Sequence, residues 1–333
     1  MIRPLRCLLL ALVLCLPALS EPGGISAAAW SADGKYLVTV GSKRRLRVHQ
    51  GDTGKIVKAI TVPGEATTLI SFSPDSGSQE ENRLTQLCVS GDRVVTVGLD
   101  HNLHWWSLPG LQPLAQSSAT YGVVGLSMGG EITAYTATSS RYLDAEISWV
   151  RLSKGKQEGS MLPNLPPPDS SSSFGGPTVS SDGCWVMAMT AGEPTLWEMR
   201  NEEITTSVLD AKAHLGPWAL GSQRFYTSRA DGVRGYLYEN PTAESLYIGC
   251  KDPRALMVTS DESRLVVQTR SGLSIYDLSS GTKLLGWGRP DQPPLTVSGD
   301  ARFGFVLTEK TLEVWEISTQ RCLYRLPARS KSL

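Results

Sequence analysis

The sequence lacks the compact motifs of common enzyme chemistry. It contains no glycine-rich phosphate loop, no His-Glu-x-x-His motif and no Gly-x-Ser-x-Gly motif. Histidine is scarce, with 4 residues in 333, and the close pair His101 and His104 has no third ligand nearby in the sequence. We therefore predict no catalytic residues, no metal and no cofactor, and we expect these two histidines to lie at the surface.

An excess of charge of either sign is also missing. The 32 Lys and Arg residues balance the 32 Asp and Glu residues, and the nine tryptophans are not interleaved with basic residues. A nucleic-acid-binding protein needs clustered basic side chains to neutralise phosphates. The composition therefore argues against a nucleic-acid partner.

The apolar run from Leu8 to Leu16 is shorter than the roughly 20 residues that a membrane-spanning helix needs. Arg3 and Arg6 precede the run, and small residues occupy positions 18 and 20, before Glu21. This pattern is typical of a secretory signal peptide. We therefore expect residues 1–20 to be removed and the protein to be secreted or periplasmic, without a stable membrane span.

Four cysteines remain after residue 20, namely Cys88, Cys184, Cys250 and Cys322. An even number in a disulfide-permissive compartment allows three pairings. Their wide and irregular spacing favours the role of small buried hydrophobic residues instead.

A short unit recurs along the chain, and its clearest copy is the last one, Pro294 to Pro327. Polar turns at 298–300, 309–310 and 318–321 divide this copy into four short apolar segments. Four short strands repeated at about forty residues are typical of the blades of a propeller.

Seven positions align with the aromatic residue of the third strand, at intervals of 57, 44, 47, 41, 38 and 39 residues. They are His49, Trp106, Val150, Trp197, Tyr238, Tyr276 and Trp315. The sequence therefore predicts an all-β, seven-bladed β-propeller of four-stranded antiparallel blades. It occupies residues 21–327 as one domain, and a short tail follows at 328–333.

The turn between the first and second strands also recurs. It reads Ser31-Ala32-Asp33-Gly34, Ser73-Pro74-Asp75, Ser180-Ser181-Asp182-Gly183, Ser260-Asp261 and Ser298-Gly299-Asp300. A tight hairpin needs a residue with positive φ or a side chain that bonds its own backbone.

Trp315-Glu316, Trp197-Glu198 and Tyr276-Asp277 stand where the WD40 β-propeller family carries Trp-Asp, and the repeats resemble that family from Ile25 to Pro327. The family's Gly-His pair is missing from nearly every repeat. Asp52 to Lys55 and Ser280 to Lys283 resemble quinoprotein-type propeller repeats equally well. The resemblance implies blade-stabilising roles and no active site; the structural residues that it marks are Trp106, Trp197, Trp315, Asp100 and Asp231.

Two segments interrupt the repeats, Pro74 to Arg83 and Leu162 to Pro177. Either Leu69 to Ser73 is the first strand of blade 2 and the first segment lies inside the blade, or Leu87 to Val89 is that strand and the segment links two blades. Recognition residues concentrate on loops, and Pro-rich sequence cannot enter a sheet interior. The candidate interaction residues are Asp75, Glu80, Glu81, Arg83, Pro166, Pro167, Pro168, Asp169 and Phe174.

The ends of the chain predict how the ring closes. Blade 1 begins at its first strand, Ile25 to Trp30, and blade 7 ends with a complete fourth strand, so neither end lends a strand to the other. We expect side-chain packing at Trp30 to close the ring. Alternation within a strand also predicts that Trp105 and Trp106 point to opposite faces of their sheet.

These observations favour a non-catalytic extracytoplasmic scaffold, a monomer, that binds a protein or peptide through one rim of the ring. The first alternative is an enzyme, a quinoprotein-like dehydrogenase or a hydrolase, with carboxylates, His or Arg converging on the central channel. The second is capture of a small ligand without reaction, which requires an apolar channel mouth.

Overall fold

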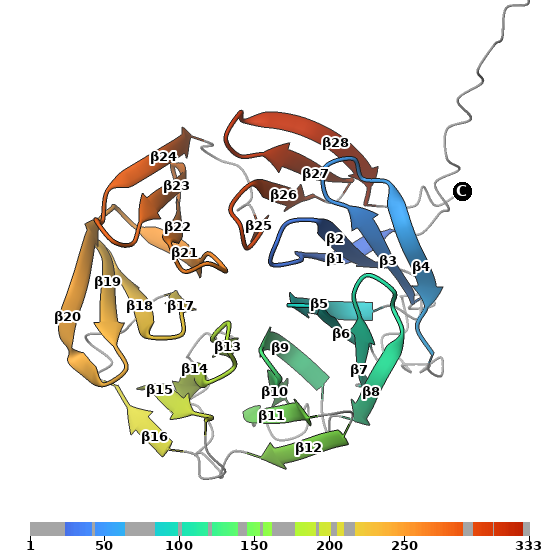
Figure 1. Ribbon diagram of the computed structural model, residues 1–333, viewed down its shortest axis with the longest axis horizontal. Coiled ribbons are helices and arrows are strands. Elements are labelled where there is room, and N and C mark those ends of the chain that lie inside the picture. Colours follow the sequence, from blue (N-terminus) through green and yellow to red (C-terminus); the bar gives the residue numbers. More distant parts are fainter. Residues whose placement is uncertain are drawn as a thin grey trace, which may run out of the picture.

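The computed structural model describes residues 24–41, 44–63, 84–98, 102–118, 122–138, 145–153, 156–161, 177–190, 193–200, 205–209, 217–288, 296–308 and 310–328. Within these ranges the regular elements are all β-strands, which form seven four-stranded antiparallel sheets. The sheets stand around a ring as blades, with the first strand of each nearest the axis and the fourth at the rim (Figure 1). The predicted seven-bladed propeller is confirmed.

Each blade consists of four consecutive strands. Blade 1 consists of β1 (Ile25–Trp30), β2 (Tyr36–Gly41), β3 (Arg45–Gln50) and β4 (Ile56–Thr61), and blade 2 of β5 (Leu84–Ser90), β6 (Arg93–Gly98), β7 (Asn102–Ser107) and β8 (Pro113–Ser118). Blade 3 consists of β9 (Gly122–Gly129), β10 (Ile132–Thr138), β11 (Ala145–Ser153) and β12 (Lys156–Met161), and blade 4 of β13 (Thr178–Val179), β14 (Trp185–Thr190), β15 (Glu193–Glu198) and β16 (Thr205–Val208). Blade 5 consists of β17 (Trp218–Leu220), β18 (Arg224–Arg229), β19 (Gly232–Leu237) and β20 (Asn240–Gly249). Blade 6 consists of β21 (Pro253–Val258), β22 (Arg264–Thr269), β23 (Gly272–Asp277) and β24 (Lys283–Gly288). Blade 7 consists of β25 (Thr296–Val297), β26 (Phe303–Leu307), β27 (Thr311–Glu316) and β28 (Arg321–Pro327).

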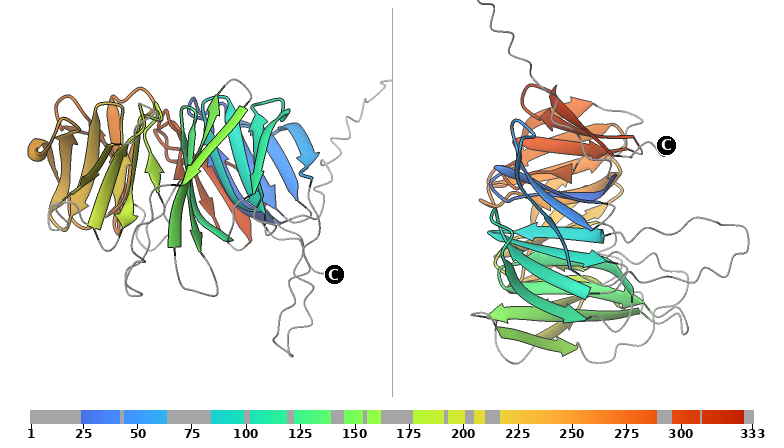
Figure 2. Two further views of the ribbon diagram at one scale, coloured as in Figure 1. Left: turned by 90° about the horizontal axis from the view of Figure 1, so that it is seen from below. Right: turned by 90° about the vertical axis from the view of Figure 1, so that its right-hand side faces the viewer.

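The burial of each strand follows its place in the blade. β2 reads YLVTVG and is buried at five of its six residues, whereas β4 reads IVKAIT and is exposed at five of six. A strand covered on both faces reads as a nearly continuous apolar run, and a rim strand does not. The strands run from one face of the disc to the other (Figure 2).

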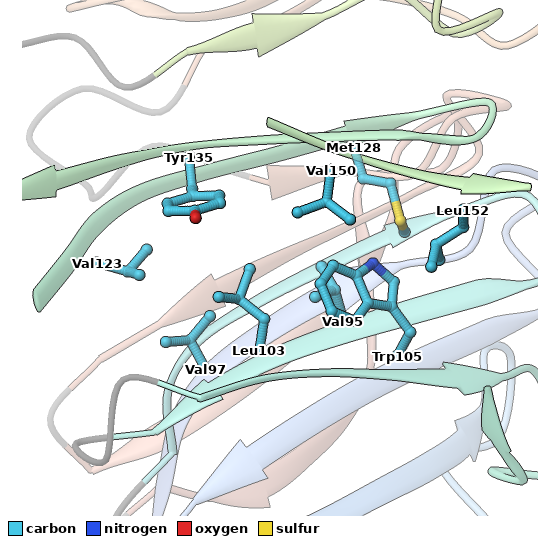
Figure 3. Close-up of a cluster of buried hydrophobic side chains, with 9 residues drawn as sticks. All are labelled: Val95, Val97, Leu103, Trp105, Val123, Met128, Tyr135, Val150 and Leu152. Carbon is cyan, nitrogen blue, oxygen red and sulfur yellow. The ribbon is translucent and has the colours of Figure 1, made fainter. Parts of the chain in front are cut away.

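The hydrophobic core is divided among the seven interfaces between neighbouring blades. Between blades 2 and 3, Trp105 and Leu103 of β7 pack against Val150 and Tyr135 (Figure 3). Its neighbour Trp106 packs on the other side, against blade 1. The predicted opposite orientation of the two tryptophans is therefore confirmed.

The repeated third-strand position has a constant register. It pairs with the second residue of the second strand in every blade, as Trp197 does with Val186 and Tyr276 does with Leu265. In blade 5 the residue at this register is Tyr236, paired with Phe225, so the assignment of Tyr238 was wrong. Two tyrosines two residues apart share one face of a strand, so a period of two cannot choose between them.

His49 holds this register in blade 1 and pairs with Leu37. Its Nδ1 lies 3.1 Å from the carbonyl oxygen of Gly54, to which it donates, so Nε2 accepts from the Thr39 hydroxyl at 3.0 Å. In blade 2, Trp106 Nε1 donates to the hydroxyl of Thr96 at 3.1 Å. Histidine in blade 1 therefore takes the place of tryptophan and keeps the side-chain hydrogen bond to the threonine of the second strand. Burial lowers the pKa of His49.

The structure selects one of the two placements in blade 2. The first strand is β5, and its turn to β6 is Gly91 and Asp92. Ser73-Pro74-Asp75 is therefore not a turn within this blade, contrary to its place among the recurring turns. The segment 74–83 links blades 1 and 2 and lies outside the described residues.

The ring closes between blades 7 and 1 without an exchanged strand, as predicted. Trp30 stacks on Phe303 with ring centroids 5.6 Å apart, and its Nε1 donates to the carbonyl of Thr296 at 3.2 Å. At the rim, the Tyr324 hydroxyl donates to the carbonyl of Gly51 at 3.0 Å. Packing and two side-chain hydrogen bonds therefore join the blades.

All four cysteines of the described chain are free and partly buried, which leaves none of the three disulfide pairings formed. Burial raises the pKa of Cys88 to about 11. His104 is buried and stacks on Trp106 at 5.9 Å, so the expectation of a surface histidine was wrong there. His101 lies outside the described residues.

Candidate functional site

The antiparallel order of each blade gives the ring two different faces. The turns between first and second strands and between third and fourth strands lie on one face, here named the hairpin face. The turns between second and third strands and the links between blades lie on the other, the linker face.

One hydrogen-bond network builds four of the turns on the hairpin face. In blade 1 the Ser31 hydroxyl donates to Asp33 Oδ1 (2.8 Å), the Lys35 amide donates to the same oxygen (3.1 Å), and the Tyr36 amide donates to Ser31 Oγ (2.9 Å). The same bonds recur at Ser180, Asp182, Cys184 and Trp185; at Thr259, Asp261, Ser263 and Arg264; and at Ser298, Asp300, Arg302 and Phe303. These carboxylates hold their own turns.

The residue after each of these aspartates has a positive φ, as the sequence predicted for such a turn. It is glycine at Gly34 and Gly183, but Glu262 and Ala301 adopt φ values of 54° and 57°. A residue with a Cβ rarely adopts this conformation without compensation.

Glu262 shows what compensates. Its carboxylate accepts hydrogen bonds from the Ser222 amide (2.6 Å) and hydroxyl (2.8 Å) in blade 5, and from the Ser181 hydroxyl (3.1 Å) in blade 4. The neighbouring Ser260 hydroxyl donates to the carbonyl of Ala32 in blade 1 at 3.2 Å. The turn of blade 6 therefore ties together turns from several blades around the axis.

A hollow with a volume of about 750 Å³ lies on the hairpin face between blades 4 and 5. We name it the blade 4–5 hollow. Its lining residues are Asp182, Trp185, Glu198, Arg200, Ser222, Gln223, Leu237, Tyr238 and Glu239. They come from hairpins of the two adjacent blades, so the ring itself fixes the hollow.

Stacked aromatic rings form one wall of the hollow. Trp185 and Tyr238 lie 4.0 Å apart with an interplanar angle of 8°, and the Arg200 guanidinium lies 5.5 Å from the centre of the Trp185 ring. The Tyr238 hydroxyl donates to the carbonyl of Gly221 at 2.8 Å, and burial raises its pKa. The wall is therefore neutral, apolar and fixed from both blades.

The charged residues of the hollow are mostly acidic. Asp182, Glu198 and Glu239 face a single lining cation, Arg200, whose Nε lies 3.9 Å from Glu198 Oε1. Leu237 is 37% exposed at the rim. The hollow therefore combines an apolar contact surface with an excess of negative charge.

A smaller hollow of about 390 Å³ lies at the seam of blades 7 and 1. These two blades stand across the ring from blades 4 and 5 (Figure 1). Its charged lining residues are Lys35, Asp52 and Arg302, beside Tyr36 and Phe303. Lys35 pairs with Asp33 at 2.9 Å. The lining of the first hollow is therefore the more acidic of the two.

The candidate interaction residues Asp75, Glu80, Glu81, Arg83, Pro166, Pro167, Pro168, Asp169 and Phe174 lie outside the described residues, as does Asp100. Of the structural residues, Trp106 and Trp197 are buried and Trp315 is partly buried in the interface with blade 6. Asp231, in the turn from β18 to β19, forms a two-pronged pair with Arg234 at 3.0 and 2.9 Å.

Sequence reasoning missed the blade 4–5 hollow. Its signal was the aromatic pair Trp185 and Tyr238, but only the fold brings these residues together. Within the described parts of the chain, no group of three His, Cys, Asp or Glu side chains is placed to hold a metal ion. The same parts contain no helix long and apolar enough to cross a membrane.

No family model and no curated protein matches the sequence. Solved structures match the fold over almost the whole chain. Hsv2 of Kluyveromyces lactis is 10% identical with a TM-score of 0.57, covering 92% of this chain and 99% of Hsv2. The Cps50 (Swd1) β-propeller domain of Myceliophteria thermophila is 12% identical with a TM-score of 0.53, covering 90% and 98%. The computationally designed Ika8 protein is 15% identical with a TM-score of 0.55, covering 94% and 89%.

The molecule is thus defined by its fold as a seven-bladed β-propeller. Identities of 10 to 15% support the fold alone, so its function must be argued from its own surface.

Proposed function

We propose that this protein is a non-catalytic extracytoplasmic scaffold that binds a protein or peptide partner in the blade 4–5 hollow. The observation that carries the proposal is the lining of that hollow. A fixed aromatic wall, an exposed leucine and several carboxylates meet on a rigid ring, and this combination suits recognition of a polypeptide segment.

The carboxylates of the turns between first and second strands stabilise the fold, which argues against an acid–base site near the axis of the ring. A catalytic acid or base must be free to exchange a proton with a substrate. Asp33, Asp261 and Asp300 each accept bonds from their own turn, and Glu262 accepts three bonds from neighbouring blades. The Thr259 hydroxyl holds the pKa of Asp261 below its ordinary value, so this group stays ionised.

The proposed location rests on the N-terminal sequence pattern. Arginines, a short apolar run and small residues before Glu21 are what a secretory signal requires. The proposed monomeric state is supported by the interface of blades 7 and 1, which completes the ring within one chain. Light scattering of the purified protein tests it.

Site-specific photocrosslinking tests the binding proposal. A photoreactive amino acid replaces Leu237 at the rim of the hollow, and a matched variant carries it at Leu114 on β8, where the side chain is also exposed. Both are expressed in the native host, and crosslinked segments are identified by mass spectrometry. A free peptide of the captured sequence is then titrated against the protein.

We expect one recurring polypeptide segment to crosslink at Leu237 and not at Leu114, and the free peptide to compete with that crosslink. The proposal fails if the folded Leu237 variant captures no segment that competes as a peptide.

A further inference from the structure

We infer that the blade 4–5 hollow binds a cationic side chain, arginine or lysine, presented by an extended segment of the partner. This inference rests on the proposed function and specifies the chemistry of the segment.

The lining of the hollow has an excess of negative charge that favours a cation. Three carboxylates, those of Asp182, Glu198 and Glu239, line the hollow with one guanidinium, that of Arg200. A fourth carboxylate, Glu262, borders it through its two bonds to Ser222. An entering cation gains charge-assisted hydrogen bonds from such a lining, whereas an anionic segment is repelled.

The aromatic wall favours a long side chain with an aliphatic stem over a flat ring. Trp185 already stacks on Tyr238 and carries the Arg200 guanidinium over its ring. A ligand with a flat neutral ring would have to displace this guanidinium before it could stack. The aliphatic stem of a lysine or arginine instead packs along Leu237 and the wall while its charged end reaches the carboxylates.

The hollow at the seam of blades 7 and 1 offers an internal contrast. Lys35 and Arg302 line it with a single carboxylate, Asp52. A cationic segment that reaches the hairpin face therefore meets a larger excess of carboxylates in the blade 4–5 hollow and is directed there.

Titration with charged peptides tests the inference on the purified full-length mature chain. The probes are four fluorescein-labelled Gly/Ser peptides of equal length that carry several Arg, Lys, Gln or Glu residues at the same positions. Binding is followed by fluorescence anisotropy at low and high salt. We expect the Arg and Lys peptides to bind and to weaken with salt, because exposed charges are screened beyond about 10 Å at 0.1 M salt.

Three variants locate the binding. The pair Glu198→Lys and Glu239→Lys should weaken binding of the Arg peptide by about tenfold or more, because two attractive charges become repulsive. Arg200→Gln removes the one lining cation and should strengthen binding by about threefold. Glu193→Lys is the matched control, since it alters an exposed glutamate at the linker-face end of β15 and should change affinity by less than about twofold.

The strengthening by Arg200→Gln separates recognition from damage to the fold, because a misfolded variant does not bind more tightly. Preferential binding of the Glu or Gln peptide, or equal effects of Glu193→Lys and the double variant, would overturn the inference. Those results leave the proposed function standing if Leu237 still crosslinks a competing segment. Absence of that crosslink overturns the proposed function itself.

Discussion

Replacing Trp30 by alanine should destabilise the protein by about 4 kcal/mol, because this side chain fills the interface that closes the ring. Trp30 is 6% exposed and packs against Phe303 and Phe305, with ring centroids 5.6 and 6.4 Å away. Truncation of a buried tryptophan to alanine costs roughly 3 to 5 kcal/mol, most of it lost apolar burial and an unfilled cavity.

Two smaller effects adjust this magnitude. The stacked pair with Phe303 adds roughly 0.5 to 1.5 kcal/mol beyond burial. The hydrogen bond from Trp30 Nε1 to the carbonyl of Thr296 is also lost, but Thr296 is exposed and its carbonyl can bond to water instead. Measured truncations of buried aromatic residues already include the loss of such contacts, so the value stays near the middle of the range.

The assay is urea unfolding followed by far-UV circular dichroism, because fluorescence would change with the removed tryptophan. Lys58→Ala on the exposed strand β4 is the control in the same blade and should change the free energy of unfolding by less than about 0.5 kcal/mol. Trp197→Ala, within the interface of blades 3 and 4, should match Trp30→Ala in size. Equal and small effects of Trp30→Ala and Lys58→Ala would refute the closure by packing.

Three further predictions concern other parts of the chain. Glu262→Gly should lower the free energy of unfolding by about 2 kcal/mol, because three hydrogen bonds to the carboxylate are lost and relief of the positive φ returns only about 1 kcal/mol. Urea unfolding measures this change, and an unchanged urea midpoint would contradict the bridging role of Glu262. Burial lowers the pKa of His49, so the unfolded state takes up the proton first as pH falls, and the free energy of unfolding should decrease below about pH 6.5. His49→Gln should reduce this slope between about pH 7 and 5, and an identical slope would exclude His49 as its source. Mass spectrometry of the protein from its native host should find an N-terminus near Glu21, and an intact Met1 would contradict the proposed signal peptide.

The ring was predictable because its causes are local in the sequence. Apolar segments that alternate with turn residues fix the strands, and the aromatic position every forty residues or so fixes the blades. Closure at Trp30 followed from counting strands at the two ends. The assignment of Tyr238 to the repeated third-strand position was wrong because Tyr236 and Tyr238 both fit the alternation of a strand. Only the pairing of Tyr236 with Phe225 distinguishes them.

The hollow was not predictable, because it belongs to two repeats at once. Trp185 begins the second strand of blade 4, and Tyr238 follows the third strand of blade 5. No pattern within either repeat shows that their rings stack. Glu262 is similar, since its positive φ is compensated by Ser222 and Ser181 in other blades. The sequence patterns therefore pointed to the two long segments, whereas the proposed site lies on the hairpins of blades 4 and 5.

Hydrogen exchange measured with and without the captured peptide tests the central claim most directly, because it reports which face of the ring the partner covers. We predict slower exchange at 182–185, 198–200, 221–223 and 237–239, the hairpins that line the blade 4–5 hollow. Slower exchange at 74–83 or 162–176, with the hairpins of the hollow unchanged, would contradict the proposal and assign recognition to those two segments.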